Sequence, residues 1–121
     1  MNADLSRPLR ILAVEDSADA LHILCELLSL IGHDVTGAAD AARALALLDE
    51  KNFDVLLTDI NLPGMSGVHL ARRTKAAFPG IKIIFASGHD DAMASYVGFP
   101  STWLGKPYEY TSLVQALQPE S

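Results

Sequence analysis

Five side chains that can do chemistry follow four separate apolar runs of this 121-residue sequence. They are Glu15, Asp16, Asp59, Ser87 and Lys106. Three of them are carboxylates, which repel one another at short range and need a cation beside them. A ligand set made only of oxygen favours a hard ion such as Mg²⁺. The ammonium and the hydroxyl could then neutralise oxygens of a phosphoryl group bound next to that ion.

The elements that must position these side chains can be predicted from the hydrophobic pattern. Short apolar runs, typical of strands buried on both faces, alternate with segments of helical periodicity. We expect strands over residues 11–14, 35–38, 53–58, 81–86 and 102–104, and helices over 18–31, 41–51, 66–77, 90–97 and 110–117. This alternation predicts an α/β fold, with a doubly wound parallel sheet that has helices on both faces.

The carboxyl ends of parallel strands meet at one edge of such a sheet, where ligands bind. Glu15 and Asp16 follow the first strand, Asp59 the third, Ser87 the fourth and Lys106 the fifth. We therefore expect the five side chains to form one acidic pocket. The length predicts a single domain over residues 1–121, with an ordered core at about 8–118.

The predicted helices carry start and stop signals. Ser17, Asp40 and Ser66 stand where side-chain caps are expected, and Gly32 can end the first helix. We expect the first helix to present one apolar face, formed by Ala20, Ile23, Leu24, Leu27 and Ile31.

Composition excludes several classes of protein. The formal net charge is −6 and the basic residues are scattered, which argues against nucleic-acid binding. The lone Cys25 cannot form a disulfide framework or a thiolate metal site. The four histidines (His22, His33, His69, His89) lack metal-ligand spacing, so we expect surface residues. No apolar run approaches the roughly 20 residues needed to cross a bilayer, and we expect a cytoplasmic protein without membrane contact.

The sequence resembles the receiver domain of bacterial two-component response regulators over essentially its whole length. The matching segments are residues 14–16, 58–67, 86–88 and 105–107. The turn Leu62-Pro63-Gly64-Met65-Ser66-Gly67 after an aspartate is the most characteristic of them. The resemblance is nearest to receivers of hybrid histidine kinases and to single-domain regulators. It implies a flavodoxin-like sheet of strand order 2-1-3-4-5 with five helices, in a monomer or weak dimer.

The resemblance also implies a role for each residue of the pocket. Asp59 would be the nucleophile that takes a phosphoryl group from a phosphohistidine of a sensor histidine kinase or histidine phosphotransfer protein. Asp16 and Asp59 would bind Mg²⁺ directly, Glu15 through a water, and Asn61 through its backbone carbonyl. Lys106 would pair first with Asp59 and then with the phosphoryl group.

Further residues would read or tune that phosphorylation. Ser87 would move to hydrogen-bond a phosphoryl oxygen, and Trp103 would occupy the aromatic switch position coupled to it. His89, two residues after Ser87, would line the pocket mouth and tune the rate at which water hydrolyses the acyl phosphate. The Lys106–Pro107 peptide is expected to be cis. Such a protein is not a classical enzyme, although it could catalyse its own phosphorylation and dephosphorylation.

The segment between Ser87 and Lys106 is shorter than in most receivers. Gly98 and Pro100 restrict the fourth predicted helix to residues 90–97, so we expect it to be short or irregular. Receivers commonly dimerise through this region, and the standard dimer is therefore in doubt.

Three alternatives remain beside the phosphorylated receiver. The fold could serve as a protein-interaction module that is not phosphorylated, although such modules usually lose one of the acidic residues or the lysine. An aspartate-nucleophile phosphatase would need a second aspartate where Asn61 stands, because an amide cannot act as the general acid. A flavin-binding protein would need a loop for the flavin phosphate, and none is recognisable.

Overall fold

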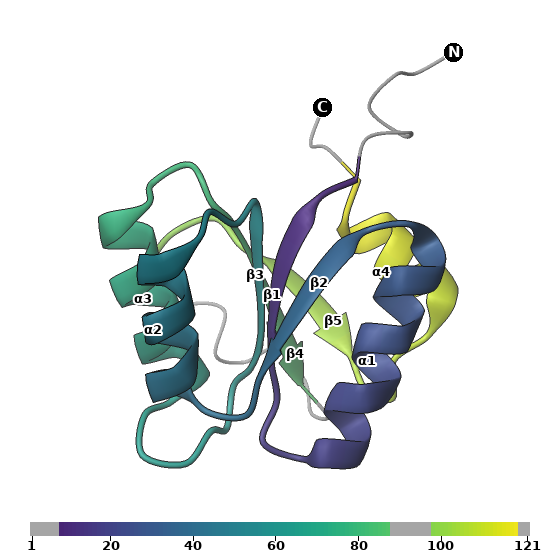
Figure 1. Ribbon diagram of the computed structural model, residues 1–121, viewed down its shortest axis with the longest axis horizontal. Coiled ribbons are helices and arrows are strands. Elements are labelled where there is room, and N and C mark those ends of the chain that lie inside the picture. The colour runs from purple at the N-terminus through teal and green to yellow at the C-terminus, as the bar shows by residue number, and fades with distance from the viewer. Residues whose placement is uncertain (1–7, 88–97, 119–121) are drawn as a thin grey trace.

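A five-stranded parallel sheet forms the middle layer of the computed structural model, which describes residues 8–87 and 98–118 (Figure 1). Its strands are β1 (Arg10–Val14), β2 (Asp34–Ala38), β3 (Val55–Asp59), β4 (Lys82–Ser87) and β5 (Thr102–Gly105). They pair in the order β2-β1-β3-β4-β5, with parallel neighbours throughout. The predicted fold class and strand order are therefore confirmed.

Helices cover both faces of this sheet. They are α1 (Ala18–Ile31), α2 (Ala41–Glu50), α3 (Gly67–Ala77) and α4 (Tyr110–Ala116). Figure 1 shows α2 and α3 on one side of the sheet and α1 and α4 on the other. The predicted helix over residues 90–97, and its short or irregular form, lie outside the described residues. Within the described ranges, no helix has both the length and the apolarity that a membrane span requires.

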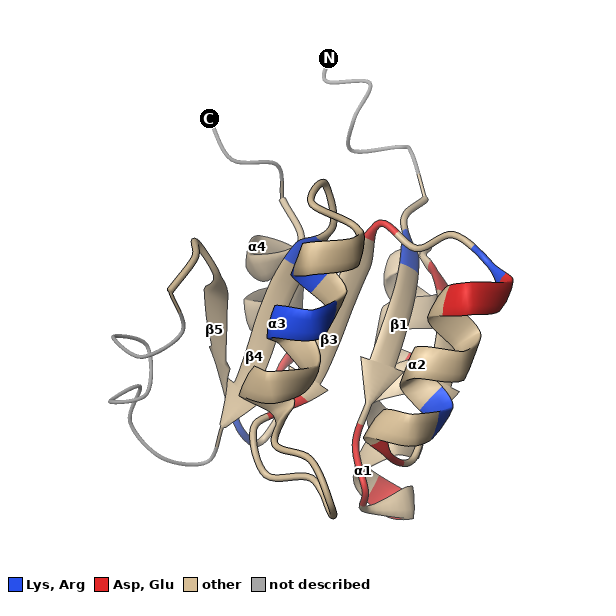
Figure 2. Cartoon of the chain, turned by 90° about the vertical axis from the view of Figure 1, so that its left-hand side faces the viewer, with Lys and Arg blue, Asp and Glu red and all other residues tan. Residues whose placement is uncertain are grey.

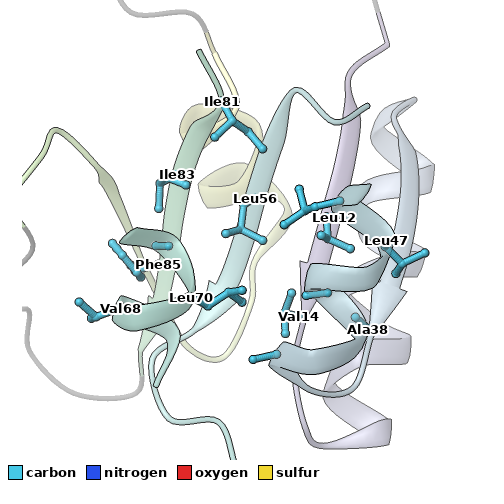
Figure 3. Close-up of a cluster of buried hydrophobic side chains, with 14 of the residues drawn as sticks. Leu12, Val14, Ala38, Leu47, Leu56, Val68, Leu70, Ile81, Ile83 and Phe85 are labelled. Atoms are coloured by element: carbon cyan, nitrogen blue, oxygen red, sulfur yellow. The ribbon is translucent and has the colours of Figure 1, made fainter. Parts of the chain in front are cut away.

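Two apolar clusters, one on each face, hold the layers together. Successive strand residues point to opposite faces, so Leu12 and Val14 pack under α2 and α3, while Ile11 and Ala13 pack under α1 and α4. Figure 3 shows the first cluster, in which Leu56 and Phe85 meet Leu70 and other side chains of the two helices. Burial of both faces explains why the strands read as continuous apolar runs.

The predicted caps are present. The Ser17 hydroxyl accepts a hydrogen bond from the Ala20 N–H, and Gly32 ends α1 at a φ of 112°. The Asp40 carboxylate and the Ser66 hydroxyl cap α2 and α3 in the same way. These caps fix the residue at which each of the three helices begins.

The predicted apolar face of α1 is confirmed at Leu24, Leu27 and Ile31, which contact the core, but it wrongly included Ile23 and omitted Leu28. Leu24 and Leu28 are the residues of α1 that are buried, whereas Ile23 is half exposed. The helix is apolar around most of its circumference, so its own periodicity does not select a face. Packing against the sheet and α4 selects it instead.

The third strand begins two residues later than predicted, at Val55. The Asp54 carboxylate accepts hydrogen bonds from the backbone N–H and the guanidinium of Arg10. Phe53 is not part of the sheet, and it packs against the cluster under α2 and α3 with Lys51 over its ring. Phe53 therefore contributes to the apolar core but not to the sheet.

Candidate functional site

Three carboxylates lie together at the carboxyl edge of the sheet. Glu15 and Asp16 directly follow β1, and Asp59 is the last residue of β3. Each offers an oxygen within 4.8 Å of the oxygens of the other two. Figure 2 shows the acidic segments after β1 and at the end of β3. Since β1 and β3 are neighbours in the sheet, Glu15 and Asp59 become adjacent although they are 44 positions apart in the sequence.

These carboxylates differ in their exposure to solvent. Glu15 is 2% exposed and Asp59 is 8% exposed, whereas Asp16 is exposed. A buried carboxylate is costly unless a cation or hydrogen-bond donors compensate it. The two buried ones therefore need partners supplied by the fold.

Lys106 is the partner that they share. Its Nζ lies 2.9 Å from Glu15 Oε2 and 3.1 Å from Asp59 Oδ2. Burial alone would lower the pKa of Lys106, but the hydrogen bonds to Glu15 and Asp59, together with the negative charges of both carboxylates, outweigh burial and raise it. The ammonium is therefore firmly charged and bridges the carboxylates that follow β1 and β3.

The pairing of β5 with β4 places Lys106 beside the carboxylate cluster. The Lys106 N–H donates to the Ser87 carbonyl oxygen at 3.0 Å, which continues the pairing of β5 with β4. The Lys106–Pro107 peptide is cis, as the resemblance implied. Because β5 ends at Gly105, opposite the last residue of β4, Lys106 stands at the same edge of the sheet as the carboxylates.

Tyr108 also contributes to the site, although it was not among the residues predicted from the sequence. Its hydroxyl donates a hydrogen bond to Glu15 Oε2 at 2.9 Å. Burial, followed by the charge and hydrogen bond of Glu15, raises the pKa of Tyr108, so the phenol stays a donor. An aromatic residue after a Lys-Pro pair is easily taken for a packing residue, and only the tertiary structure brings it to Glu15.

The loop after β3 surrounds Asp59 closely. The Asn61 N–H approaches Asp59 Oδ1 at 3.4 Å, and the Thr58 hydroxyl donates to the Asp59 carbonyl oxygen at 2.9 Å. The Gly67 N–H donates to the Ile60 carbonyl oxygen at 2.6 Å, at the start of α3. A Cβ at Gly67 would overlap the Asp59 carbonyl oxygen, so this position requires glycine. Asn61, whose carbonyl was predicted as a metal ligand, therefore lies in the loop beside Asp59.

Ser87 and Trp103 lie on neighbouring strands. Ser87 is the last residue of β4 and pairs with Gly105, while Trp103 pairs with Phe85. The rings of Trp103 and Phe85 have centroids 4.9 Å apart, and Trp103 Nε1 donates to the Ser101 hydroxyl. His89 lies outside the described residues.

The donor set fits a hard divalent cation. All of its atoms are carboxylate oxygens, drawn from Glu15, Asp16 and Asp59. Lys106 supplies one positive charge against three negative ones, so the described cluster retains an excess of negative charge. Mg²⁺ would remove that excess.

Comparisons with known proteins show the family to which the chain is similar. The family model of the response regulator receiver domain matches residues 11–118. Over 79 residues the chain is 42% identical to the response regulator receiver protein CpdR of Brucella abortus, a match that spans 65% of this chain and 66% of CpdR. Over 69 residues it is 46% identical to the virulence sensor protein BvgS of Bordetella pertussis, spanning 57% of this chain but 6% of BvgS.

Solved structures show the same architecture. A response regulator receiver protein from Sinorhizobium medicae aligns with a TM-score of 0.84 and 28% identity, covering 92% of each chain. The resemblance drawn from the sequence is thus confirmed by both sequence and structure comparisons.

Proposed function

Since the chain belongs to the response regulator receiver domain family, we propose that Asp59 accepts a phosphoryl group from a phosphohistidine and thereby switches partner binding. The observation that carries this proposal is the arrangement around Asp59. Its carboxylate is 8% exposed, is paired with Lys106 at 3.1 Å, and shares a three-carboxylate cluster with Glu15 and Asp16. A nucleophile, an ammonium and a cation-binding set are what phosphoryl transfer requires.

The proposed transfer is a substitution at phosphorus. An Asp59 carboxylate oxygen attacks the phosphorus, the P–O bond forms, and the P–N bond to the histidine breaks. The electron pair of that bond leaves with the imidazole nitrogen, which takes a proton from water. The product is an aspartyl phosphate.

The remaining residues act on charge and position. Glu15, Asp16, Asp59 and the Asn61 carbonyl would hold Mg²⁺, which supplies neutralisation of the charge on the phosphoryl oxygens. Lys106 would pair with the Asp59 carboxylate before the transfer and with the phosphoryl group after it. Ser87 would donate its hydroxyl to a phosphoryl oxygen from the end of β4.

The proposed readout runs through Trp103. Its ring packs against Phe85, two residues before Ser87 on β4. A movement of Ser87 toward the phosphoryl group would therefore disturb the packing of neighbouring strand residues and shift a two-state equilibrium at this face. His89 remains proposed as a residue that tunes hydrolysis.

The proposal includes partners and context. A sensor histidine kinase or a histidine phosphotransfer protein would supply the phosphoryl group in the cytoplasm. Residues 1–121 would form one receiver domain, monomeric or weakly dimeric. The matched range of 11–118 supports that extent.

A receiver that only binds partners, without phosphorylation, is the second candidate. The presence of Asp59, Lys106 and both acidic residues in one cluster favours the phosphorylated function over it. The phosphatase alternative lacks a general acid, because Asn61 stands two residues after the nucleophile.

Acetyl phosphate with Mg²⁺ tests the proposal. We expect the wild-type chain to gain one phosphoryl group that is labile to hydroxylamine, and we expect Asp59→Asn and EDTA each to prevent the gain. Intact-mass spectrometry before and after hydroxylamine measures it. A wild-type chain that gains no phosphoryl group from acetyl phosphate or from any histidine kinase would leave the binding module as the function.

A further inference from the structure

Tyr108 and Lys106 converge on a single oxygen atom. The Tyr108 hydroxyl and the Lys106 ammonium each lie 2.9 Å from Glu15 Oε2. Tyr108 is 93 residues from Glu15 in the sequence and sits in the segment between β5 and α4. The Lys106 ammonium lies 6.0 Å from the centroid of the Tyr108 ring. One carboxylate oxygen thus interacts with two donors, which belong to the residues directly before and after Pro107.

The two donors are not equivalent, because Lys106 also interacts with a second carboxylate. Its ammonium also contacts Asp59 Oδ2 at 3.1 Å, whereas the hydroxyl of Tyr108 donates only to Glu15 among the described contacts. A phosphoryl group on Asp59 adds about 1.5 to 2 negative charges at pH 7 and competes for the same ammonium. As Lys106 turns toward that group, its hold on Glu15 weakens.

Glu15 cannot tolerate the loss of both donors. Its side chain is 2% exposed, so bulk solvent does not replace a missing hydrogen bond. A buried carboxylate oxygen left without a donor carries the full cost of its desolvation. Beside any Mg²⁺ that the cluster holds, a donor other than Lys106 is therefore needed to keep Glu15 Oε2 hydrogen-bonded in the phosphorylated state.

We propose that Tyr108 is a positioning residue that holds Glu15 while Lys106 moves to the phosphoryl group on Asp59. The hydroxyl of Tyr108 makes Glu15 independent of the lysine and so lowers the free energy of the phosphorylated state. This inference rests on the proposed phosphorylation of Asp59. It assigns a function to a hydroxyl that aromatic packing alone would not require.

The ring and the hydroxyl of Tyr108 can be tested separately. The ring packs against the apolar cluster under α1 and α4. Tyr108→Phe keeps that packing and removes only the donor. Tyr110→Phe is the matched control, since Tyr110 is half exposed at the start of α4.

The probes are Mg²⁺ alone and then beryllium trifluoride, an inorganic mimic of an aspartyl phosphate, at saturating Mg²⁺. Calorimetry measures the first affinity and ¹⁹F NMR of the bound fluoride measures the second. We expect Tyr108→Phe to weaken beryllium trifluoride binding about tenfold, which corresponds to ~1.4 kcal/mol. We expect the Mg²⁺ dissociation constant to change by less than about threefold, and Tyr110→Phe to change neither.

A second arm tests whether Tyr108 acts through Glu15. In a Glu15→Gln background the side chain has no charge to compensate, so Tyr108→Phe should have little further effect on beryllium trifluoride binding. An equal loss in both backgrounds would overturn the inference. So would an equal loss of Mg²⁺ and beryllium trifluoride affinity, which indicates a purely structural role.

The failure of this inference is distinct from that of the proposed function. If the wild-type chain binds beryllium trifluoride and Tyr108→Phe binds it as tightly, the inference is wrong and the proposed function stands. If the wild-type chain binds no beryllium trifluoride and takes no phosphoryl group, both are wrong.

Discussion

Replacing Gly67 by alanine should damage the phosphoacceptor loop, although helix propensity alone predicts the opposite. Gly67 is the first residue of α3, where alanine normally stabilises a helix by up to about 1 kcal/mol relative to glycine. At this position, however, a Cβ would overlap the carbonyl oxygen of Asp59. The next nearest atoms are the Asp59 carbonyl carbon at 2.9 Å and Ile60 Cα at 3.0 Å. All are backbone atoms, so no side-chain rotation relieves the contact.

The expected magnitude follows from these contacts. Overpacking costs about 1–3 kcal/mol when surrounding atoms must shift. A displaced α3 also weakens the hydrogen bond from the Gly67 N–H to the Ile60 carbonyl oxygen, which contributes about 0.5–1.5 kcal/mol. After subtraction of the helix gain, Gly67→Ala should lower the free energy of unfolding by about 0.5–3.5 kcal/mol. Because the displaced atoms belong to Asp59, beryllium trifluoride binding should fall as well.

Urea unfolding and ¹⁹F NMR measure the two effects. Gly80→Ala is the matched control, because a Cβ there would meet no atom within 4 Å and the φ of Gly80 is not positive. We expect Gly80→Ala to retain wild-type stability and beryllium trifluoride affinity. A Gly67→Ala chain as stable as Gly80→Ala would refute the steric argument.

Two further predictions concern the lysine and a histidine. Lys106→Met removes the ammonium shared by two buried carboxylates, so in EDTA it should lower the free energy of unfolding by about 1–3 kcal/mol. Mg²⁺ should then raise the melting temperature more in this variant than in wild type, and an equal rise would contradict the pairing. His33 Nδ1 accepts the Leu9 N–H at 3.0 Å, and burial lowers the pKa of His33 below its ordinary value of 6.5. The unfolded chain therefore binds the proton more readily, and stability should fall as pH drops from about 6.5 through the folded pKa. Urea titrations at several pH values should show a smaller fall in His33→Asn and an unchanged fall in His69→Gln, and an identical fall in all three chains would exclude His33.

Much of the fold was determined locally. The strand and helix order follows from hydrophobic periodicity, and Ser17, Asp40 and Ser66 mark helix starts within a few residues of themselves. Because βα units wind a parallel sheet in one hand, the order of elements also predicts which strand ends face the same edge. For that reason the sequence alone predicts that Glu15, Asp16, Asp59 and Lys106 lie together.

Predictions from the hydrophobic pattern were wrong where more than one way of packing the segment fits that pattern. The segment of α1 is apolar on most sides, so periodicity predicted Ile23 in the core, whereas Leu28 is buried and Ile23 is half exposed. Phe53 was assigned to a strand because it is apolar, yet it packs against the cluster beside the sheet. His33 was expected to be a surface residue, whereas the fold partly buries it and brings its ring to the Leu9 backbone.

The sequence by itself determined which residues stand at the strand ends, and so the composition of the acidic cluster. Tertiary structure alone decided how those residues share their hydrogen bonds. The ammonium of Lys106 bridges Glu15 and Asp59, and the hydroxyl of Tyr108 donates a further hydrogen bond to Glu15. The physical reason is that burial and hydrogen bonding depend on groups up to 93 residues away, whose approach no local pattern encodes.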